Sequence, residues 1–363
     1  MLRKTILLLF LLHLFGSSFS QERDDLVESQ IPERRKNVYK GNPKPKPGPA
    51  KGKKGTGGKK TEIPVSKADI SELQAADRDY EQNAYASAAA TFLKHAEKLD
   101  GEQCYRLGWM HEYGKGVTVD FGNAMFWYRK AAEKENSQAM NSIGSMYYND
   151  KGVAQDFGEA MRWFKKAAEL GNAVSMSNVG RMYAHGLSVP QNDSIAMRWF
   201  LKAAEKGNEW AMTNIGVSYA TGQGIPQDYG IAMQWFMKAA EKNYPFAMNN
   251  IGVLYANGRG VPRDDSIAMQ WYRKAAEKGN AAAMNNIGNI YYNGRGAAKN
   301  NNAAMEWFMM SAEKGNADEM YNIGRMYEKG DYGKKNKKEA TIWYIKSAQK
   351  GHQEARKALD RLD

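Results

Sequence analysis

The residue types that most often carry catalysis or metal binding are scarce in this sequence and are not spaced for either task. Cys104 is the only cysteine, so an intrachain disulfide is impossible. Beyond the first 20 residues the histidines are His95, His111, His185 and His352, and none has a second ligand at the spacing of a metal site. No nucleophile can be paired with a base. We therefore predict a protein that is not an enzyme and that holds neither a metal nor a cofactor.

One polar residue type does recur at a fixed spacing and could bind a partner. Asparagine occupies the same slot every 36 residues, at Asn178, Asn214, Asn250, Asn286 and Asn322. At about 100° per residue, this slot lies about 150° from the apolar stripe of its helix. An amide side chain both donates and accepts hydrogen bonds, so the column could pair with a peptide backbone. The alternative is that each asparagine bonds to a neighbouring helix or to water.

The column needs a scaffold with the same period, and the rest of the sequence has it. Glycine and tryptophan each recur every 36 residues, the glycine after an aliphatic residue. The copies include Gly144, Gly180, Gly216, Gly252, Gly288 and Trp163, Trp199, Trp235, Trp271, Trp307. A fixed period between 20 and 50 residues is typical of a repeat array.

Each period predicts two helices joined by a tight turn. In the copy that starts at residue 247, Met248, Ile251 and Gly252 share one face of a first helix, and Trp271 lies on a second. The glycine lets the two backbones approach closely, and we expect the tryptophan to fill the groove beside it and to be buried. Asp264 and its equivalents are placed to cap the second helix.

One helix pair cannot bury its own apolar face, so neighbouring pairs must stack. The predicted fold is therefore all-α, an α-solenoid of 36-residue helix-turn-helix units wound into a right-handed superhelix. Residues 101–352 form seven repeats, residues 67–100 a degenerate N-terminal capping repeat, and residues 353–363 a C-terminal capping helix. Cys104 stands where later copies have methionine, which predicts a buried thiol.

These residues carry a family resemblance. The pattern A-M-N-x-I-G-x-x-Y-x-x-G-x-G-V-x-x-D, followed by A-M-x-W-F/Y-x-K-A-A-E-x-G-N, resembles the Sel-one-like repeats, which are relatives of the tetratricopeptide repeats. The resemblance covers about residues 101–352. It implies an adaptor or scaffold that binds other proteins, usually without catalysis.

Residues 1–20 predict a secretory signal peptide. Arg3 and Lys4 precede an apolar run at residues 6–15, which is too short to span a bilayer, and Ser18 and Ser20 precede the expected mature start at Gln21. We therefore expect an exported protein, periplasmic or extracellular, whose mature chain has no transmembrane span.

Residues 21–66 predict a disordered linker rich in lysine, proline and glycine. Residues 34–60 contain eleven lysines and arginines and no acidic residue. The run is either a solvated spacer or a tether to an anionic envelope surface. The candidate tether residues are Arg34, Arg35, Lys36, Lys53, Lys54, Lys59 and Lys60. We do not expect nucleic acid as a partner, because the chain is exported and the run lacks interleaved aromatic residues.

The predicted function is a secreted or periplasmic scaffold that binds protein or peptide partners on the concave face of the solenoid. Two alternatives stay open: a cell-envelope enzyme or peptidoglycan-fragment binder, and a quality-control adaptor of a secretory lumen. If the asparagines instead join neighbouring repeats, the binding surface should lie among the variable residues of the first helices, namely Arg181, Val217, Val253, Asn289 and Arg325.

Overall fold

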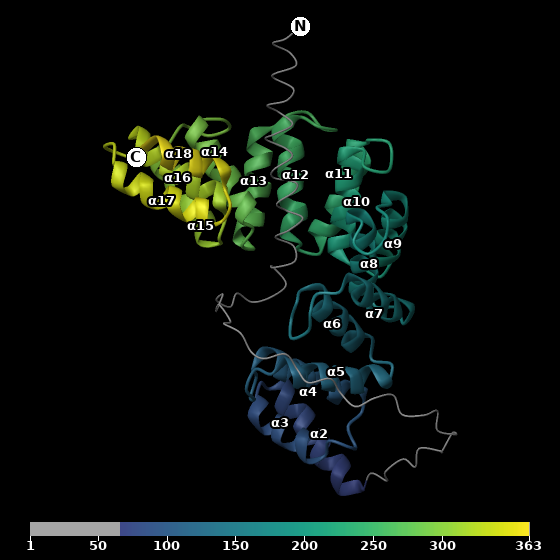
Figure 1. The fold of residues 1–363 in the computed structure, drawn as a ribbon. Helices are drawn as coiled ribbons and strands as arrows, with labels where there is room; N and C mark the ends of the chain where they lie inside the picture. Colours follow the sequence, from purple (N-terminus) through teal and green to yellow (C-terminus); the bar gives the residue numbers. More distant parts are fainter. Residues whose placement is uncertain (1–65, 363) are drawn as a thin grey trace. The chain divides into compact units, whose positions relative to one another are not determined.

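The computed structural model describes residues 66–362, and every regular element within that range is an α-helix (Figure 1). The helices are α2 (Lys67–Glu81), α3 (Tyr85–Lys94), α4 (Gly101–Tyr113), α5 (Phe121–Glu133), α6 (Ser137–Tyr148), α7 (Phe157–Glu169), α8 (Ala173–His185), α9 (Asp193–Glu205), α10 (Glu209–Thr221), α11 (Tyr229–Glu241), α12 (Pro245–Asn257), α13 (Asp265–Glu277), α14 (Ala281–Asn293), α15 (Asn301–Glu313), α16 (Ala317–Lys329), α17 (Lys337–Gln349) and α18 (Gln353–Leu362). Each helix packs against the next one along the chain, which confirms the predicted all-α solenoid.

The N-terminal predictions fall outside the described residues. These are the signal peptide at residues 1–20, the linker up to residue 65, and the tether residues within 34–60. The last predicted linker residue, Ser66, is described and begins a helix. Its side chain accepts a hydrogen bond from the Asp69 backbone N–H over 3.1 Å, and the Asp69 carboxylate accepts one from the Ser66 N–H over 2.9 Å. This reciprocal pair caps α2.

The helix ends are set by local sequence, as predicted. In α13 the Asp264 carboxylate accepts hydrogen bonds from the backbone N–H groups of Ser266 and Ile267, both over 2.9 Å. Such bonds satisfy amides that have no partner inside the helix. All seven second helices of the repeats begin with this kind of cap, at Asp120, Asp156, Asn192, Asp228, Asp264, Asn300 and Asn336.

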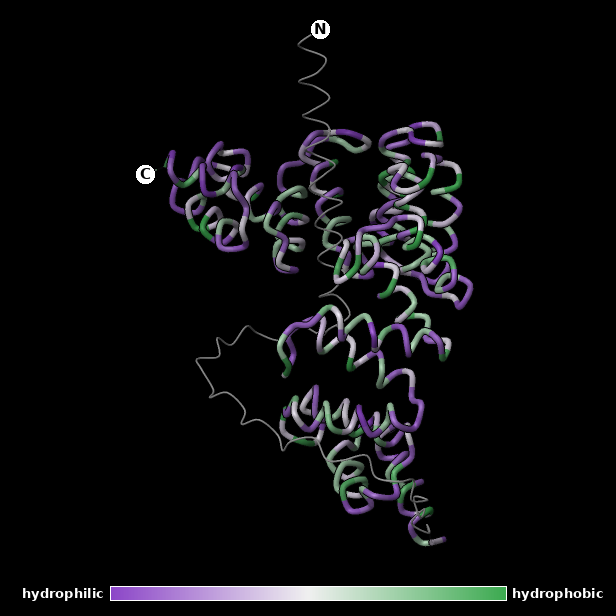
Figure 2. Tube along the Cα trace, turned by 45° about the vertical axis from the view of Figure 1, so that its right-hand side comes forward, coloured by the Kyte–Doolittle hydropathy of each residue, from purple (hydrophilic) through white to green (hydrophobic). Residues whose placement is uncertain are grey.

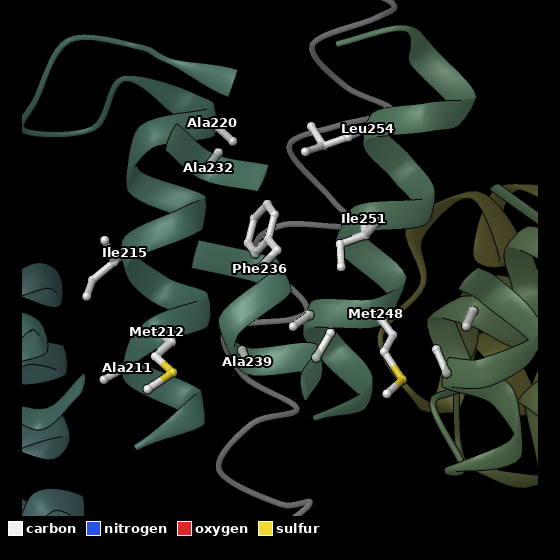
Figure 3. Close-up of a cluster of buried hydrophobic side chains, with 14 of the residues drawn as sticks. Ala211, Met212, Ile215, Ala220, Ala232, Phe236, Ala239, Met248, Ile251 and Leu254 are labelled. Carbon is white, nitrogen blue, oxygen red and sulfur yellow. The ribbon is translucent and has the colours of Figure 1, made fainter. Parts of the chain in front are cut away.

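The aromatic residue that packs against the repeated glycine is not the tryptophan. In the repeat at the centre of the array, a Cβ atom on Gly216 would lie 2.5 Å from the ring of Phe236, the residue after Trp235. Figure 3 shows the Phe236 ring between Ile215 of α10 and Ile251 of α12. Every repeat has the same contact, in the pairs Gly108–Tyr128, Gly144–Phe164, Gly180–Phe200, Gly216–Phe236, Gly252–Tyr272, Gly288–Phe308 and Gly324–Tyr344.

The prediction that the tryptophan fills this groove is therefore wrong, and helix geometry gives the reason. Neighbouring side chains point about 100° apart, so only one of two adjacent aromatic residues can face the first helix of its own repeat. Phe236 is 1% exposed, whereas Trp235 is only partly buried. A lysine one turn later lies over the tryptophan ring in five repeats. The pairs are Trp163–Lys166, Trp199–Lys202, Trp235–Lys238, Trp271–Lys274 and Trp343–Lys346.

The core runs from repeat to repeat without a break in the middle of the array. A single cluster of buried residues extends from Ala168 in α7 to Ile290 in α14. Figure 2 shows hydrophobic and hydrophilic residues alternating along the helices, as this packing requires. Cys104 is 2% exposed, so the predicted burial of its thiol is confirmed. Cohesion between neighbours thus dominates the stability of such an array.

None of the helices in residues 66–362 combines the length and the apolar character needed to cross a bilayer.

Candidate functional site

The asparagine column lies between neighbouring first helices. Asn250 is 4% exposed and the other four column residues are partly buried. The Asn286 Nδ2 donates a hydrogen bond to Asn249 Oδ1, 37 residues earlier, over 3.0 Å. The Asn214 Nδ2 instead donates to the backbone carbonyl of Trp210 over 2.8 Å. The Asn286 amide therefore joins neighbouring repeats, whereas the Asn214 amide bonds within its own helix.

This result corrects the premise that the asparagine slot points away from the protein. The slot is opposite the apolar stripe of its own helix, but a stacked array brings the first helix of the preceding repeat against that side. Asn178 shows the contact: its Nδ2 donates to Asn141 Oδ1 of α6 over 3.1 Å. A role of Asn178, Asn214, Asn250, Asn286 and Asn322 in partner binding stays a prediction.

The side chains that do face outward come from the second, ninth and thirteenth residues of each first helix. These positions are seven and eleven residues apart, so they share one side of a helix. In α8, α10 and α12 they are Val174, Arg181, His185, Trp210, Val217, Thr221, Phe246, Val253 and Asn257. All nine are partly or fully exposed. We call this surface the first-helix face.

The first-helix face is apolar at its centre. Trp210 and Val217 of α10 occupy the same helix positions as Phe246 and Val253 of α12, and Val174 of α8 is 38% exposed. At the position of Val217 and Val253, the flanking first helices carry polar residues, Ser145 in α6 and Asn289 in α14. A partly exposed apolar strip with polar flanks is typical of a surface that another protein covers.

Packing holds the aromatic residues of this face in place. The Trp210 ring meets the ring of Phe200 edge to face, with centroids 5.6 Å apart. The Phe246 ring lies 5.5 Å from that of Tyr244. The surface is therefore preorganised, which lowers the entropic cost of binding.

Arg181 is the charged residue at one end of the apolar strip. Its guanidinium carbon lies 4.4 Å from the ring centroid of Tyr148 and 5.9 Å from that of Trp210. Its Nη2 donates a hydrogen bond to Asn178 Oδ1 over 3.1 Å. Burial lowers the pKa of Arg181 from its ordinary value, and the group keeps its charge because that value is so high.

The cysteine and three of the four histidines are structural in the described part of the chain. Burial raises the pKa of the Cys104 thiol to about 11, which suppresses the reactive thiolate. His95 lies between Asp69 and Glu72, and His352 lies 3.2 Å from Asp318. His111 is buried in α4, and burial lowers its pKa. Residues 66–362 contain no group of three His, Cys, Asp or Glu side chains arranged to hold a metal ion.

Sequence reasoning named three residues of the first-helix face, Arg181, Val217 and Val253, as the second choice after the asparagines. It missed Trp210 and Phe246. Their signal was available, because each precedes one of the named valines by seven residues and so shares its side of the helix.

Comparison with known proteins agrees with this architecture. The Sel1 repeat model matches seven times, at residues 104–136, 137–172, 173–208, 211–244, 245–280, 281–316 and 320–352. No curated protein is significantly similar to the chain.

Two solved structures are similar in both sequence and fold. A protective antigen present in uropathogenic Escherichia coli strains, which displays an SLR fold, is 33% identical with a TM-score of 0.59. The match covers 80% of this chain and 63% of the antigen, so this chain spans less than two thirds of that protein. A Sel1 repeat protein from Oxalobacter formigenes is 32% identical with a TM-score of 0.63, over 67% of this chain and 99% of that one. Proteins with such repeats generally serve as non-catalytic scaffolds in protein interactions. With seven matched repeats over most of its length, the chain belongs to the Sel1 repeat family.

Proposed function

We propose that this protein is a non-catalytic scaffold that binds extended protein or peptide segments along the first-helix face. The observation that carries the proposal is the apolar strip of Trp210, Val217, Phe246 and Val253, which is partly exposed to solvent and backed by a packed core. Apolar and aromatic side chains in the centre of a surface contribute most of the affinity of a protein interface.

The repeating geometry suits an extended ligand. Consecutive first helices present equivalent positions at each repeat, while the residue type changes from Arg181 to Val217, Val253 and Asn289. A ligand that lies along the array meets a different side chain at each step. The order of these side chains would set the specificity for one sequence over another.

The proposal is tested by placing charge in the strip. The double variant Val217→Asp/Val253→Asp should lose the partners that the wild-type full chain captures from envelope and extracellular proteins of its source. Captured proteins are quantified by mass spectrometry. The matched control is Leu201→Asp/Met237→Asp, because both residues are 37% exposed and lie on the second helices α9 and α11.

The control should keep the same partners at unchanged levels. Equal capture by the strip variant and the control would contradict the proposal, since the partners would then bind elsewhere. Thermal unfolding of both variants must match wild type within a few degrees for the comparison to be valid.

Export is part of the proposal and is supported by residues 1–20, whose basic start and short apolar run are typical of a signal peptide. The native protein should begin at or near Gln21 and should be recovered outside the cytoplasm. The test is to measure the intact mass of the protein purified from each cell fraction. A chain that retains Met1 and is found in the cytoplasmic fraction contradicts export.

Attachment to an anionic surface through residues 34–60 is the last part of the proposal. The run contains eleven basic residues and no acidic one. Deleting it should weaken binding to vesicles that contain an anionic phospholipid, and salt should weaken binding of the intact chain, since exposed charges are screened over about 10 Å at 0.1 M salt. If neither the deletion nor added salt changes vesicle binding, residues 34–60 act only as a spacer.

A further inference from the structure

Arg181 is a cation without a carboxylate partner among the described residues. Of its five N–H donors, one bonds to Asn178 Oδ1, and no carboxylate of residues 66–362 lies within ion-pair distance. Its Nε is fully buried and makes no hydrogen bond. Leaving a buried cation short of acceptors is costly, so an acceptor that reaches the terminal N–H groups of Arg181 is favoured.

The surroundings of Arg181 hold its guanidinium in one orientation. The rings of Tyr148 and Trp210, from the repeats before and after, lie 4.4 and 5.9 Å from the guanidinium carbon. Asn178 accepts from the guanidinium, and its own Nδ2 donates to Asn141 Oδ1. The Ser175 hydroxyl donates to the same Asn141 oxygen over 2.8 Å. This network points the Asn178 oxygen toward Arg181.

The equivalent arginine in α16 lacks this arrangement. Arg325 lies 5.7 Å from the ring of Tyr321, a residue of its own helix, and has no asparagine bond like that of Arg181. The site at Arg181 is thus assembled from three consecutive repeats, α6, α8 and α10, and not from arginine alone.

The ligand chemistry follows from the unpaired donors. The Nε is sealed inside the protein, so the donors that a ligand can reach are the N–H groups of the two terminal nitrogens. They form a planar fork that matches the two oxygens of a carboxylate. The apolar strip begins at the next first helix, α10. A ligand bound at Arg181 would therefore place apolar side chains on Trp210, Val217, Phe246 and Val253. The face also continues on the other side of Arg181, at Ser145 of α6 and at Asn149, which follows the end of α6, and this leaves room for the chain of the ligand to pass.

We propose that Arg181 binds the side-chain carboxylate of a glutamate or aspartate within a partner peptide, and that apolar side chains of the same peptide cover the strip beside it. The inference rests on the proposed function and adds the class of ligand. A side chain is favoured over a peptide C-terminus because the face extends in both directions from Arg181.

The test is a competition between two pools of acetylated, C-terminally amidated dodecapeptides. One pool has glutamate at a fixed inner position and the other has glutamine, and all other positions are drawn from glycine, serine, leucine and phenylalanine. The full-length mature chain is immobilised, and retained peptides are quantified by mass spectrometry. Wild type should prefer the glutamate pool by about tenfold, the effect of one charge-assisted bidentate contact.

Arg181→Gln should remove this preference while retention of apolar peptides persists. Arg198→Gln is the matched control, since Arg198 is exposed on the second helix α9, and it should prefer glutamate as wild type does. Arg181→Lys keeps the charge without the fork and should show a preference between those of wild type and Arg181→Gln. If circular dichroism shows that Arg181→Gln does not fold, Arg181→Lys replaces it as the test variant.

Four results would overturn the proposal. Equal retention of both pools by wild type would remove the carboxylate site but leave the scaffold function standing, whereas retention of neither pool would remove both. A preference that survives Arg181→Gln would place the carboxylate elsewhere. A preference that emerges only after deletion of residues 21–33, which contain five acidic residues, would assign the site to the chain itself.

Discussion

The interior of the repeats and the first-helix face differ in how their residues vary along the chain. At each step of 36 residues the interior keeps the same types, as at Gly216 and Gly252 or Phe236 and Tyr272. The face changes from arginine at Arg181 to valine and then to asparagine. The interior must fit an identical neighbour on both sides, so its volume is constrained. The face is only partly covered by neighbouring repeats, so its residue types are less constrained and can vary to serve recognition.

The largest effect should come from removing an interior ring. Phe236→Ala should lower the free energy of unfolding by about 3–5 kcal/mol, because it leaves a cavity in a fully packed interface. Trp235→Ala, the adjacent residue, should cost clearly less, since Trp235 is partly exposed. Urea unfolding followed by circular dichroism measures both. A larger loss for Trp235→Ala would reverse the assignment of the two aromatic residues.

The next effect comes from adding a single methyl group to the interior. Gly216→Ala should destabilise the protein by about 1–3 kcal/mol, because the new Cβ would lie 2.5 Å from the buried Phe236 ring. This clash outweighs the gain of about 1 kcal/mol that alanine brings to a helix.

The matched control for that substitution is Gly230→Ala in α11. A Cβ there meets only the Asp228 carboxylate oxygen, at 3.2 Å. The helix propensity of alanine should therefore dominate, and the midpoint should stay equal or rise. Equal losses at Gly216 and Gly230 would mean that the interior glycine is not needed for close packing.

A smaller gain is expected where one repeat departs from the glycine rule. Glu135 follows the second helix of its repeat with a backbone φ of 59°, in a slot where five other repeats have glycine. Glutamate in this left-handed conformation is strained, so Glu135→Gly should stabilise the protein by about 1 kcal/mol. The reciprocal change Gly279→Ala, at φ 85° with open space around it, should cost a similar amount. Thermal unfolding measures both, and no gain at Glu135 would contradict the strain.

The smallest effect on stability is expected on the first-helix face. Val217→Asn should change the free energy of unfolding by no more than about 0.5 kcal/mol, because its side chain is partly exposed and only flanks the buried core. Its effect should appear in partner capture instead. A loss of stability as large as that of Gly216→Ala would show that the face is part of the core.

The sequence by itself determined the elements of this protein. The period of 36 residues, the two helices of each repeat and their caps at residues such as Asp264 all follow from contacts within a few residues along the chain. The burial of Cys104 also followed, since its slot is methionine in other repeats. Local interactions of this kind depend on spacing, and spacing is visible in a sequence.

Only the tertiary structure decided which side of each helix meets which neighbour. It assigned the groove to Phe236 instead of Trp235, and it placed the asparagine column between first helices. It also showed that Arg181 lies between rings of two other repeats. The physical reason is that these contacts depend on the angle at which one helix pair packs on the next, and a single repeat does not encode that angle in its own periodicity.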